Sequence, residues 1–217
     1  MKILFRNRSR TRIVAFIGPD GSGKTTQIRL LEEYLRGHGQ RIRVKSGFSR
    51  TFEAPLRPLS HFVRLLGGGN RTAPTRPLPP TGLRRFLAHI RILIVLADCW
   101  LTWSIARYSG NRITIFDRYF YDYIPSLEWL RWDQFWFSRA FLRLPAPDVA
   151  LHLHTRATIR HLRKCLEDPA PLEYYLFMDT AYANLLRNLP VMTISSETGE
   201  NQTAHEVLRY IAADQTQ

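Results

Sequence analysis

The stretch Gly18-Pro-Asp-Gly-Ser-Gly-Lys-Thr25 decides the fold, because both its pattern and its flanks are informative. It matches G-x-x-x-x-G-K-[ST], a loop in which glycines let backbone N–H groups turn inward around phosphate oxygens. The β-branched run 12–17 before it predicts a buried strand, and residues 24–36 after it carry apolar side chains at helical spacing. A strand, this loop and a helix in succession predict phosphate binding at the helix N-terminus.

The residues of the loop have distinct expected roles in holding a nucleotide. Lys24 is expected to reach the β- and γ-phosphates of ATP, and the Thr25 hydroxyl to help hold Mg²⁺. Asp20 places a carboxylate beside phosphates, so it either orients a substrate hydroxyl as a catalytic group or bonds its own turn backbone. The whole predicted nucleotide-binding set is Gly18, Pro19, Asp20, Gly21, Ser22, Gly23, Lys24, Thr25 and Thr26.

The rest of the chain alternates short apolar runs with helix-like segments. Strands are predicted at 41–45, 113–116, 149–154 and 191–195, and helices at 81–107, 130–142, 155–166, 172–186 and 203–212. This alternation predicts an α/β fold, a three-layer sandwich whose five-stranded parallel sheet is flanked by helices. We expect one domain over 1–217, with an irregular Gly- and Pro-rich loop region at 46–80 and a ligand site at the carboxyl ends of the strands.

Asp117 is the candidate second protein ligand for Mg²⁺. It ends the apolar strand 113–116, whereas the competing strand 149–154 ends without an acid. Arg118 follows at once, and a guanidinium beside the phosphates can clamp a phosphorylated substrate with two parallel hydrogen bonds. The alternatives are an Asp that caps a turn and an Arg in a surface ion pair.

An arginine-rich helix within 155–171 is the candidate lid. Arg156, Arg160 and Arg163 recur at i, i+4 and i+7, which places them near one helix face. Such a lid would cover the phosphates and stabilise the transferring charge, so the three arginines are candidate catalytic residues. The alternative is an ordinary solvated basic face.

Composition narrows the class of protein without choosing a substrate. The chain of 217 residues has a formal net charge of +13, which favours an anionic ligand such as a nucleotide, a nucleic acid or an acidic membrane face. Cys99 and Cys165 lie far apart outside any CxxC, which argues against a disulfide framework or zinc site and fits a reducing cytoplasm. The apolar run 92–103 contains Asp98, so it predicts a buried helix and no membrane span. We expect a cytoplasmic protein.

Three weaker signals each have a structural alternative. His152 and His154 share one side of a strand, where buried histidines are commoner than metal ligands. The aromatic run 119–137 can stack a base, but is typical of a core or a subunit interface. Asp98 within an apolar helix either lines a substrate pocket or pairs with a nearby arginine.

These motifs together resemble the thymidylate kinase-like branch of the nucleoside monophosphate kinases. The resemblance rests on FIGPDGSGKTTQ at 16–27, Asp117-Arg118-Tyr119, the Ala97-Asp98 helix, the basic lid, and the later Leu172-Glu173-Tyr174…Tyr182 segment. It implies transfer of the ATP γ-phosphoryl group to a phosphorylated acceptor, by default dTMP, with Mg²⁺. It further implies that Asp20 meets a sugar hydroxyl of the acceptor, that Arg118 meets its phosphate, and that a homodimer forms through long helices such as 81–108.

Departures from the family pattern concern the acceptor. Cys99 and Val95 stand where the family has an Arg and an aromatic residue that recognise thymine, and the family's Arg-Glu-Pro type motif is replaced by a segment ending in Arg50. Lys45 or Arg50 can take the place of that motif, and the candidate acceptor-binding residues are Arg50, Asp98 and Tyr119. Kinases of other small molecules on this fold stay open, as does an ATP-binding protein without catalysis that contacts nucleic acid or a partner.

Overall fold

The computed structural model describes residues 11–46, 81–110, 113–131, 136–164, 170–187 and 189–213. Within these ranges five parallel strands form one sheet in the order β2-β3-β1-β4-β5. The strands are β1 (Arg12–Ile17), β2 (Ile42–Ser46), β3 (Ile113–Asp117), β4 (Val149–His154) and β5 (Met192–Ser195). This confirms the predicted α/β fold, and each predicted strand agrees with the observed one to within about a residue at either end.

The central position of β1 explains its sequence. Residues 13–17 are at most 1% exposed, because β3 and β4 pair with its two edges and helices cover both faces. Such a strand needs apolar side chains on both sides, which is why the run is continuous instead of alternating. The register pairs Phe16 with Asp117 and Ile17 with His152, so the loop after β1 begins between the ends of β3 and β4.

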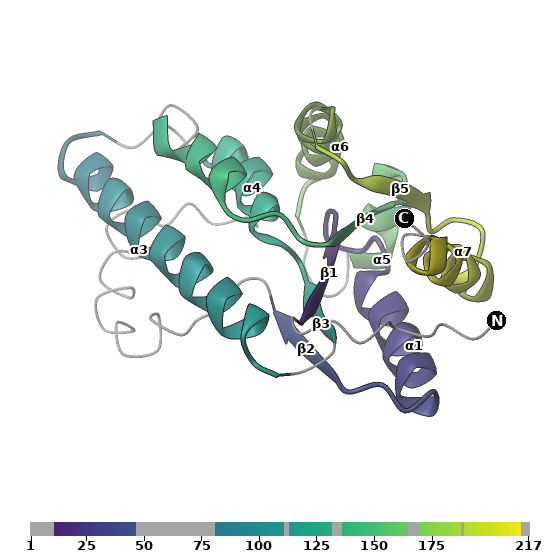
Figure 1. Cartoon of the computed structure of the whole chain (residues 1–217). Coiled ribbons are helices and arrows are strands. Elements are labelled where there is room, and N and C mark those ends of the chain that lie inside the picture. The colour runs from purple at the N-terminus through teal and green to yellow at the C-terminus, as the bar shows by residue number, and fades with distance from the viewer. Residues whose placement is uncertain are drawn as a thin grey trace.

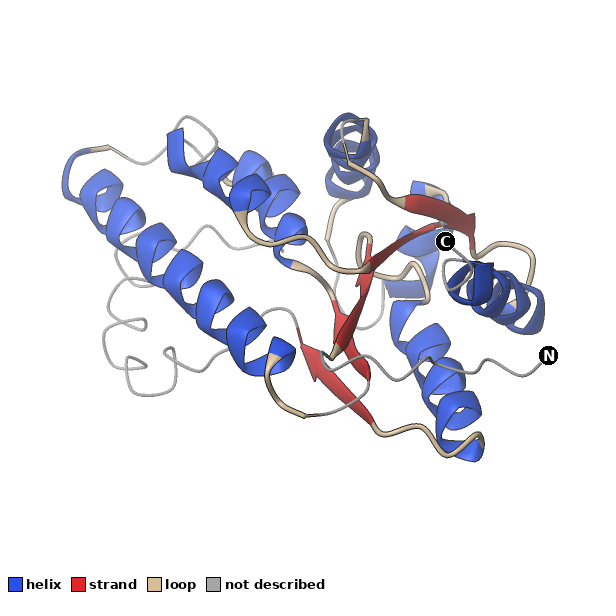
Figure 2. Ribbon diagram, in the orientation of Figure 1, coloured by secondary structure: helices blue, strands red, loops and turns tan. Residues whose placement is uncertain are grey.

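Two layers of helices enclose the sheet, as Figure 1 and Figure 2 show. One layer contains α1 (Lys24–Gly37) and α7 (Glu200–Ala213), which pack on each other and on the cluster around Val14 and Phe16. The other contains α3 (Gly82–Arg107), α4 (Tyr123–Trp129) and α6 (Leu172–Leu186), with the 3₁₀ segments η1 (Phe120–Asp122) and η2 (Trp136–Arg143) and a larger aromatic cluster. The short α5 (Ala157–Lys164) packs against α6.

The predicted helix at 130–142 is confirmed only in part, since its second half belongs to the 3₁₀ segment η2 and not to an α-helix. Helix α4 lies earlier, with Pro125 in its first turn, where a missing N–H costs no intrahelical bond. Arg131 then adopts the left-handed conformation with φ 56°, which ends the helix, and η2 begins only at Trp136. The side chain of Thr81, the residue before α3, makes no capping hydrogen bond. Residues 47–80 of the predicted irregular loop region lie outside the described residues.

Helix α3 differs from the expected buried helix. Ala88, Ile92, Cys99 and Ala106 face the core, but the opposite side is apolar and exposed. Among the described residues, Arg85–Arg107 is the one stretch that is long and apolar enough to cross a membrane by length and composition alone; 28% of its apolar window is buried. Since its inner side packs on β1 and η2, this apolar character belongs in part to the protein core.

Candidate active site

The predicted phosphate loop leaves β1 at the carboxyl edge of the sheet and turns into α1. Gly18 has φ 141°, and a Cβ there would come within 2.6 Å of the Leu153 carbonyl oxygen, so no other residue fits. Gly23, with φ 84°, precedes the first turn of α1, which carries neither a side-chain cap nor an acidic residue. The first N–H groups of α1 are therefore available to an anion.

A cavity of about 700 Å³ opens over this loop. Most of the predicted nucleotide-binding residues line it, together with residues from β3, α5 and the segment after β5. The lining residues are Asp20, Gly21, Gly23, Lys24, Thr25, Thr26, Gln27, Asp117, Arg118, Arg163, Lys164, Ser196, Glu197, Gly199 and Glu200. The structure therefore brings the predicted loop, the strand-end acid and part of the predicted lid to one place.

Lys24 is held inside the loop. Its Nζ donates to the Pro19 carbonyl oxygen at 2.7 Å and to the Ser22 hydroxyl at 3.3 Å, and the residue is 5% exposed. Burial lowers the pKa of Lys24 to about 8, although Asp122 and Asp117 attract its charge. A partly desolvated cation at the mouth of a phosphate loop gains strongly from an anion that takes the place of water.

Thr25 and Asp117 form a pair of hard oxygen donors. The Thr25 hydroxyl donates to Asp117 Oδ2 at 3.3 Å, and both line the cavity. In the described ranges, clusters of three or more His, Cys, Asp and Glu residues that could enclose a metal are absent. Two oxygen donors with open space beside them suit Mg²⁺, which is usually bound by one or two protein oxygens plus phosphates and water.

Arg118 and Asp20 form an ion pair across the cavity mouth. The Arg118 backbone has φ 71°, an uncommon conformation for a residue with a side chain, and its N–H donates to the Phe16 carbonyl oxygen at 3.0 Å. This turn aims the guanidinium at the loop after β1 instead of along β3. Two residues predicted from different motifs thus meet in the structure.

The three predicted lid arginines do not share one face. Arg156 precedes α5 and pairs with Glu197, which it helps to hold ionised by lowering the pKa of that carboxyl. Arg160 is fully buried and bonds the Thr155 and Tyr175 carbonyl oxygens and the Asp179 carboxylate. Arg163 does line the cavity, and its Nη1 donates to the Gly21 carbonyl oxygen at 3.3 Å. The expectation of one shared basic face is therefore wrong. Helix α6 packs against α5, and its Tyr175 and Asp179 bind the Arg160 guanidinium inside the protein.

Sequence reasoning missed the segment after β5 and Lys164. The Ser196 hydroxyl donates to the Ser22 carbonyl oxygen at 2.8 Å, and Gln27 Nε2 donates to the Glu200 carbonyl oxygen at 3.0 Å. This segment therefore braces the phosphate loop and the start of α1. Its polar run follows a parallel strand at the carboxyl edge, which is the signal that could have identified it.

Comparison of the whole structure with solved structures identifies the fold. A thymidylate kinase from Candida albicans matches with a TM-score of 0.66 and 16% identity over 94% of this chain and 92% of that one. A thymidylate kinase from Ehrlichia chaffeensis matches with a TM-score of 0.56 and 16% identity over 93% and 98%. The chain has the fold of thymidylate kinases. No family model and no curated protein matches the sequence.

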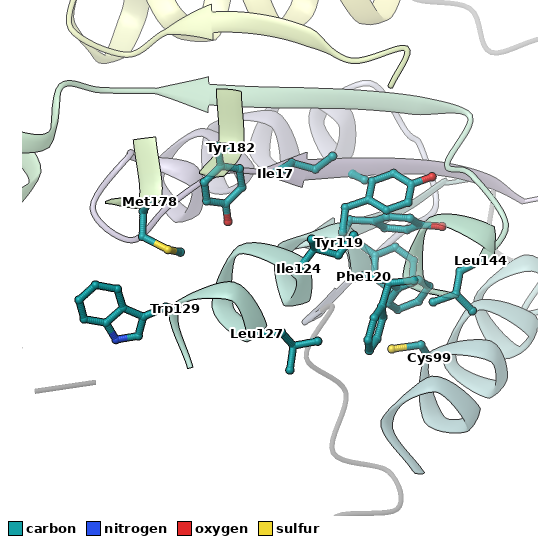
Figure 3. Packing of buried hydrophobic residues seen from close by; sticks show 14 of the residues in the cluster. Ile17, Cys99, Tyr119, Phe120, Ile124, Leu127, Trp129, Leu144, Met178 and Tyr182 are labelled. Atoms are coloured by element: carbon teal, nitrogen blue, oxygen red, sulfur yellow. The ribbon is translucent and has the colours of Figure 1, made fainter. Parts of the chain in front are cut away.

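Neither of the two predicted acceptor residues within the described ranges lines the cavity of this thymidylate kinase-like fold. Tyr119 is fully buried in the aromatic cluster beside Phe120, as Figure 3 shows, and its hydroxyl donates to the Pro145 carbonyl oxygen. This contradicts its expected contact with an acceptor, because the ring packs into the core formed by α3 and η2. Asp98 is also buried, on the inner side of α3, and does not line the cavity. Arg50 lies outside the described residues.

His152 takes the structural role and not the metal-binding one. It is buried, stacks on Tyr182 with ring centroids 5.6 Å apart, and its Nδ1 lies 3.3 Å from the Thr193 hydroxyl. Burial, assisted by the nearby positive groups His154, Lys24 and Arg160, lowers the pKa of His152 to about 3. The ring therefore stays neutral in the folded protein.

Replacing His152 with glutamine should make the protein less sensitive to acid. The unfolded chain binds a proton at this side chain near pH 6.5 and the folded one only near pH 3, so the free energy of unfolding falls as pH drops between these values. The contribution is about 2 to 3 kcal/mol between pH 6.5 and 4.5, by about 1.4 kcal/mol per pH unit. Urea unfolding at pH 7 and 4.5 measures it, with His154→Gln as the control; equal acid sensitivity of wild type and His152→Gln would contradict the assignment.

Proposed function

We propose that this chain is a kinase that transfers the γ-phosphoryl group of ATP to a phosphorylated small molecule, with nucleoside monophosphates as the acceptor class. One observation carries the proposal: Lys24, the Thr25–Asp117 pair and the Arg118–Asp20 pair all face the same cavity over a phosphate loop. The thymidylate kinase fold supports it, since this chain matches solved thymidylate kinases over more than nine-tenths of its length.

The residues supply what phosphoryl transfer requires. Backbone N–H groups of the loop and of the start of α1 hold the phosphates. Lys24 neutralises the negative charge that develops on the β-phosphate oxygens as the γ-phosphoryl group leaves. Thr25 and Asp117 would hold Mg²⁺, which supplies charge neutralisation between the β- and γ-phosphates. An acceptor oxygen forms a bond to the γ-phosphorus while the bridging bond to ADP breaks, and ADP leaves with the electron pair.

Arg118 and Asp20 act on the acceptor. A phosphorylated acceptor competes with Asp20 for the Arg118 guanidinium, which is built to hold two phosphate oxygens. The displaced Asp20 carboxylate would then accept a hydrogen bond from a hydroxyl of the acceptor. We propose α5 as a lid over this centre, with Arg163 and Lys164 as its charges toward the phosphates.

The acceptor need not be thymidylate. Cys99 is buried, and burial raises the pKa of its thiol, so its side chain is small and neutral. The family that the sequence resembles has an arginine at this position, which recognises thymine. Val95 packs against the core cluster that contains Cys99. The Candida albicans enzyme is described by its broad substrate specificity, so more than one acceptor is compatible with this fold.

An ADP-release screen tests the function. Purified protein with ATP and Mg²⁺ is assayed against dTMP, other nucleoside monophosphates and phosphosugars. We expect saturable, acceptor-dependent ADP release with at least one nucleoside monophosphate. ATP binding with no stimulation by any acceptor, together with salt-sensitive binding of nucleic acid, would instead favour the non-catalytic alternative.

We also propose that two copies pair through α3. Its outer side repeats exposed apolar residues at spacings of four and three, a pattern typical of a helix that packs on another: Phe86, Ile90, Leu93, Ala97 and Trp100. Figure 1 shows α3 along one margin of the molecule, away from α1, α5 and α7. A second copy would cover this apolar face without blocking the phosphate loop.

Replacing Trp100 with glutamate should dissociate this dimer. Trp100 is 54% exposed on the outer side of α3, so a charge there is tolerated in a monomer but is desolvated at a helix–helix contact. Sedimentation velocity at micromolar concentration should find a dimer for wild type and a monomer for Trp100→Glu. Leu176→Glu on α6, 52% exposed, is the matched control and should stay dimeric. A monomeric wild type would refute the proposed pairing.

A further inference from the structure

Asp122 is a buried carboxylate directly beneath the phosphate loop, and neither the sequence motif nor the mechanism above uses it. It is the last residue of η1 and is fully buried. Its Oδ1 accepts the Gly18 N–H at 3.2 Å and the Tyr182 hydroxyl at 2.6 Å, while its Oδ2 accepts the Tyr119 N–H at 3.1 Å. One side chain thus joins the start of the loop, the turn after Arg118, and α6.

These partners indicate that the group is ionised. Burial raises the pKa of Asp122, but Lys24 and Arg118 oppose that effect. Two of its three hydrogen-bond partners are backbone N–H groups, which can only donate, and this favours a carboxylate over a neutral acid. Among the charges that favour protonated Lys24, Asp122 has a larger effect than Asp117. The buried Asp122 carboxylate thus attracts the charge of Lys24 through the base of the loop.

Through Tyr182, the Asp122 carboxylate also links the phosphate loop to α6, which packs against α5. Tyr182 projects from α6 toward η1 and α4 in Figure 3, and it stacks on His152 of β4. One turn earlier on α6, Asp179 holds Arg160 of α5. Gly18 meanwhile cannot shift toward β4, because the Leu153 carbonyl oxygen already lies against it. The start of the loop is thus fixed between β4 on one side and Asp122 on the other.

We propose that Asp122 is a positioning residue for phosphoryl transfer: it holds the Gly18 amide at the entrance of the phosphate loop and balances the charge of Lys24 before a nucleotide arrives. The inference rests on the proposed function in that the loop binds ATP. A carboxylate needed only to cap η1 would require the Tyr119 N–H contact alone. The hydrogen bond from the Gly18 N–H and the attraction to the charge of Lys24 are what a purely structural cap does not need.

Asp122→Asn tests the proposal, since it removes the charge while keeping the shape. The amide must turn an NH₂ group toward donors at Gly18, Tyr119 or Tyr182, so we expect the dissociation constant for ATP with Mg²⁺ to rise by about tenfold or more. Ser126→Ala is the matched control, because the Ser126 hydroxyl donates at 3.1 Å to the Asp122 backbone carbonyl oxygen and not to its carboxylate. It should lower the melting temperature but leave ATP affinity within about threefold.

Nucleotide binding, measured by calorimetry without any acceptor, separates the possible failures. If wild type does not bind ATP, the proposed function fails and this inference with it. If wild type and Asp122→Asn bind ATP equally well, the inference alone is overturned. If Asp122→Asn does not fold, the double variant Lys24→Met, Asp122→Asn decides, because it removes both buried charges. Recovery of a cooperative melting transition in the double variant supports the charge pairing, and continued failure to fold overturns it.

Discussion

Replacing Lys24 with methionine should lower turnover by at least about a hundredfold and also lower thermal stability. Loss of one preorganised donor to a transferring group costs about 2.7–4 kcal/mol of transition-state stabilisation in comparable sites. Stability should fall because the variant removes the hydrogen bonds of Lys24 and leaves the buried Asp122 carboxylate without a positive charge that it attracts. Burial lowers the pKa of Lys24 to about 8, so removal of the buried ammonium group returns at most about 3 kcal/mol of that loss.

Steady-state ADP release and a thermal melt measure the two effects on the same samples. A change of about 1 kcal/mol corresponds to about 2–4 °C for a domain of this size. Arg29→Met is the matched control, since it removes a cation from the same helix but lies exposed beside Glu33. It should change neither quantity appreciably. Intact ATP affinity and intact turnover in Lys24→Met would disprove the site assignment, and a higher melting temperature would show that Asp122 does not need the charge of Lys24.

Replacing Arg118 with glycine or alanine should abolish acceptor-dependent turnover, with different costs in stability. Both variants remove the guanidinium that pairs with Asp20, so we expect about a hundredfold or greater loss of kcat/KM for the acceptor. The backbone φ of 71° favours glycine over any residue with a Cβ, and the left-handed conformation costs about 1–2 kcal/mol otherwise. Arg118→Gly should therefore be more stable than Arg118→Ala by about 1 kcal/mol.

Arg118→Lys separates charge from geometry at this position. Lysine keeps the positive charge but cannot offer two parallel N–H donors, so the Michaelis constant for the acceptor should rise while that for ATP changes little. Full activity in Arg118→Lys would mean that the bidentate grip is dispensable. Equal stability of the glycine and alanine variants, in urea unfolding, would mean that the turn at residue 118 relaxes without its side chain.

Local sequence patterns were sufficient where an element depends mainly on its own residues. The run at 12–17 predicted β1 because a strand buried on both faces needs continuous apolar side chains. The glycines at 18–23 predicted the loop because its backbone requires positive φ. Asp117 was predicted from its place at a strand end, and β3 indeed pairs beside β1 so that Asp117 meets Thr25.

The same reasoning failed where packing between distant segments sets the outcome. Helical spacing placed Arg156, Arg160 and Arg163 together, but it carries no information on α6, whose Asp179 captures Arg160. The aromatic run after Arg118 was compatible with a ligand surface, and only the approach of α3 and η2 makes Tyr119 a core residue. The apolar side chains at 130–142 recur at helical spacing, but Arg131 adopts a left-handed backbone conformation there, which an α-helix cannot contain.

By itself, the sequence determined the order of strands and helices, the phosphate loop and the acid that faces it, because these follow from backbone preferences and side-chain periodicity within a few neighbouring residues. Only the tertiary structure decided which cations face the cavity, that Asp122 lies beneath Lys24, and that α3 leaves an apolar side uncovered. Those outcomes depend on contacts between residues far apart in the chain, such as Asp122 with Gly18 and Tyr182. Burial and charge pairing act through space, so a pattern of neighbouring residues does not contain them.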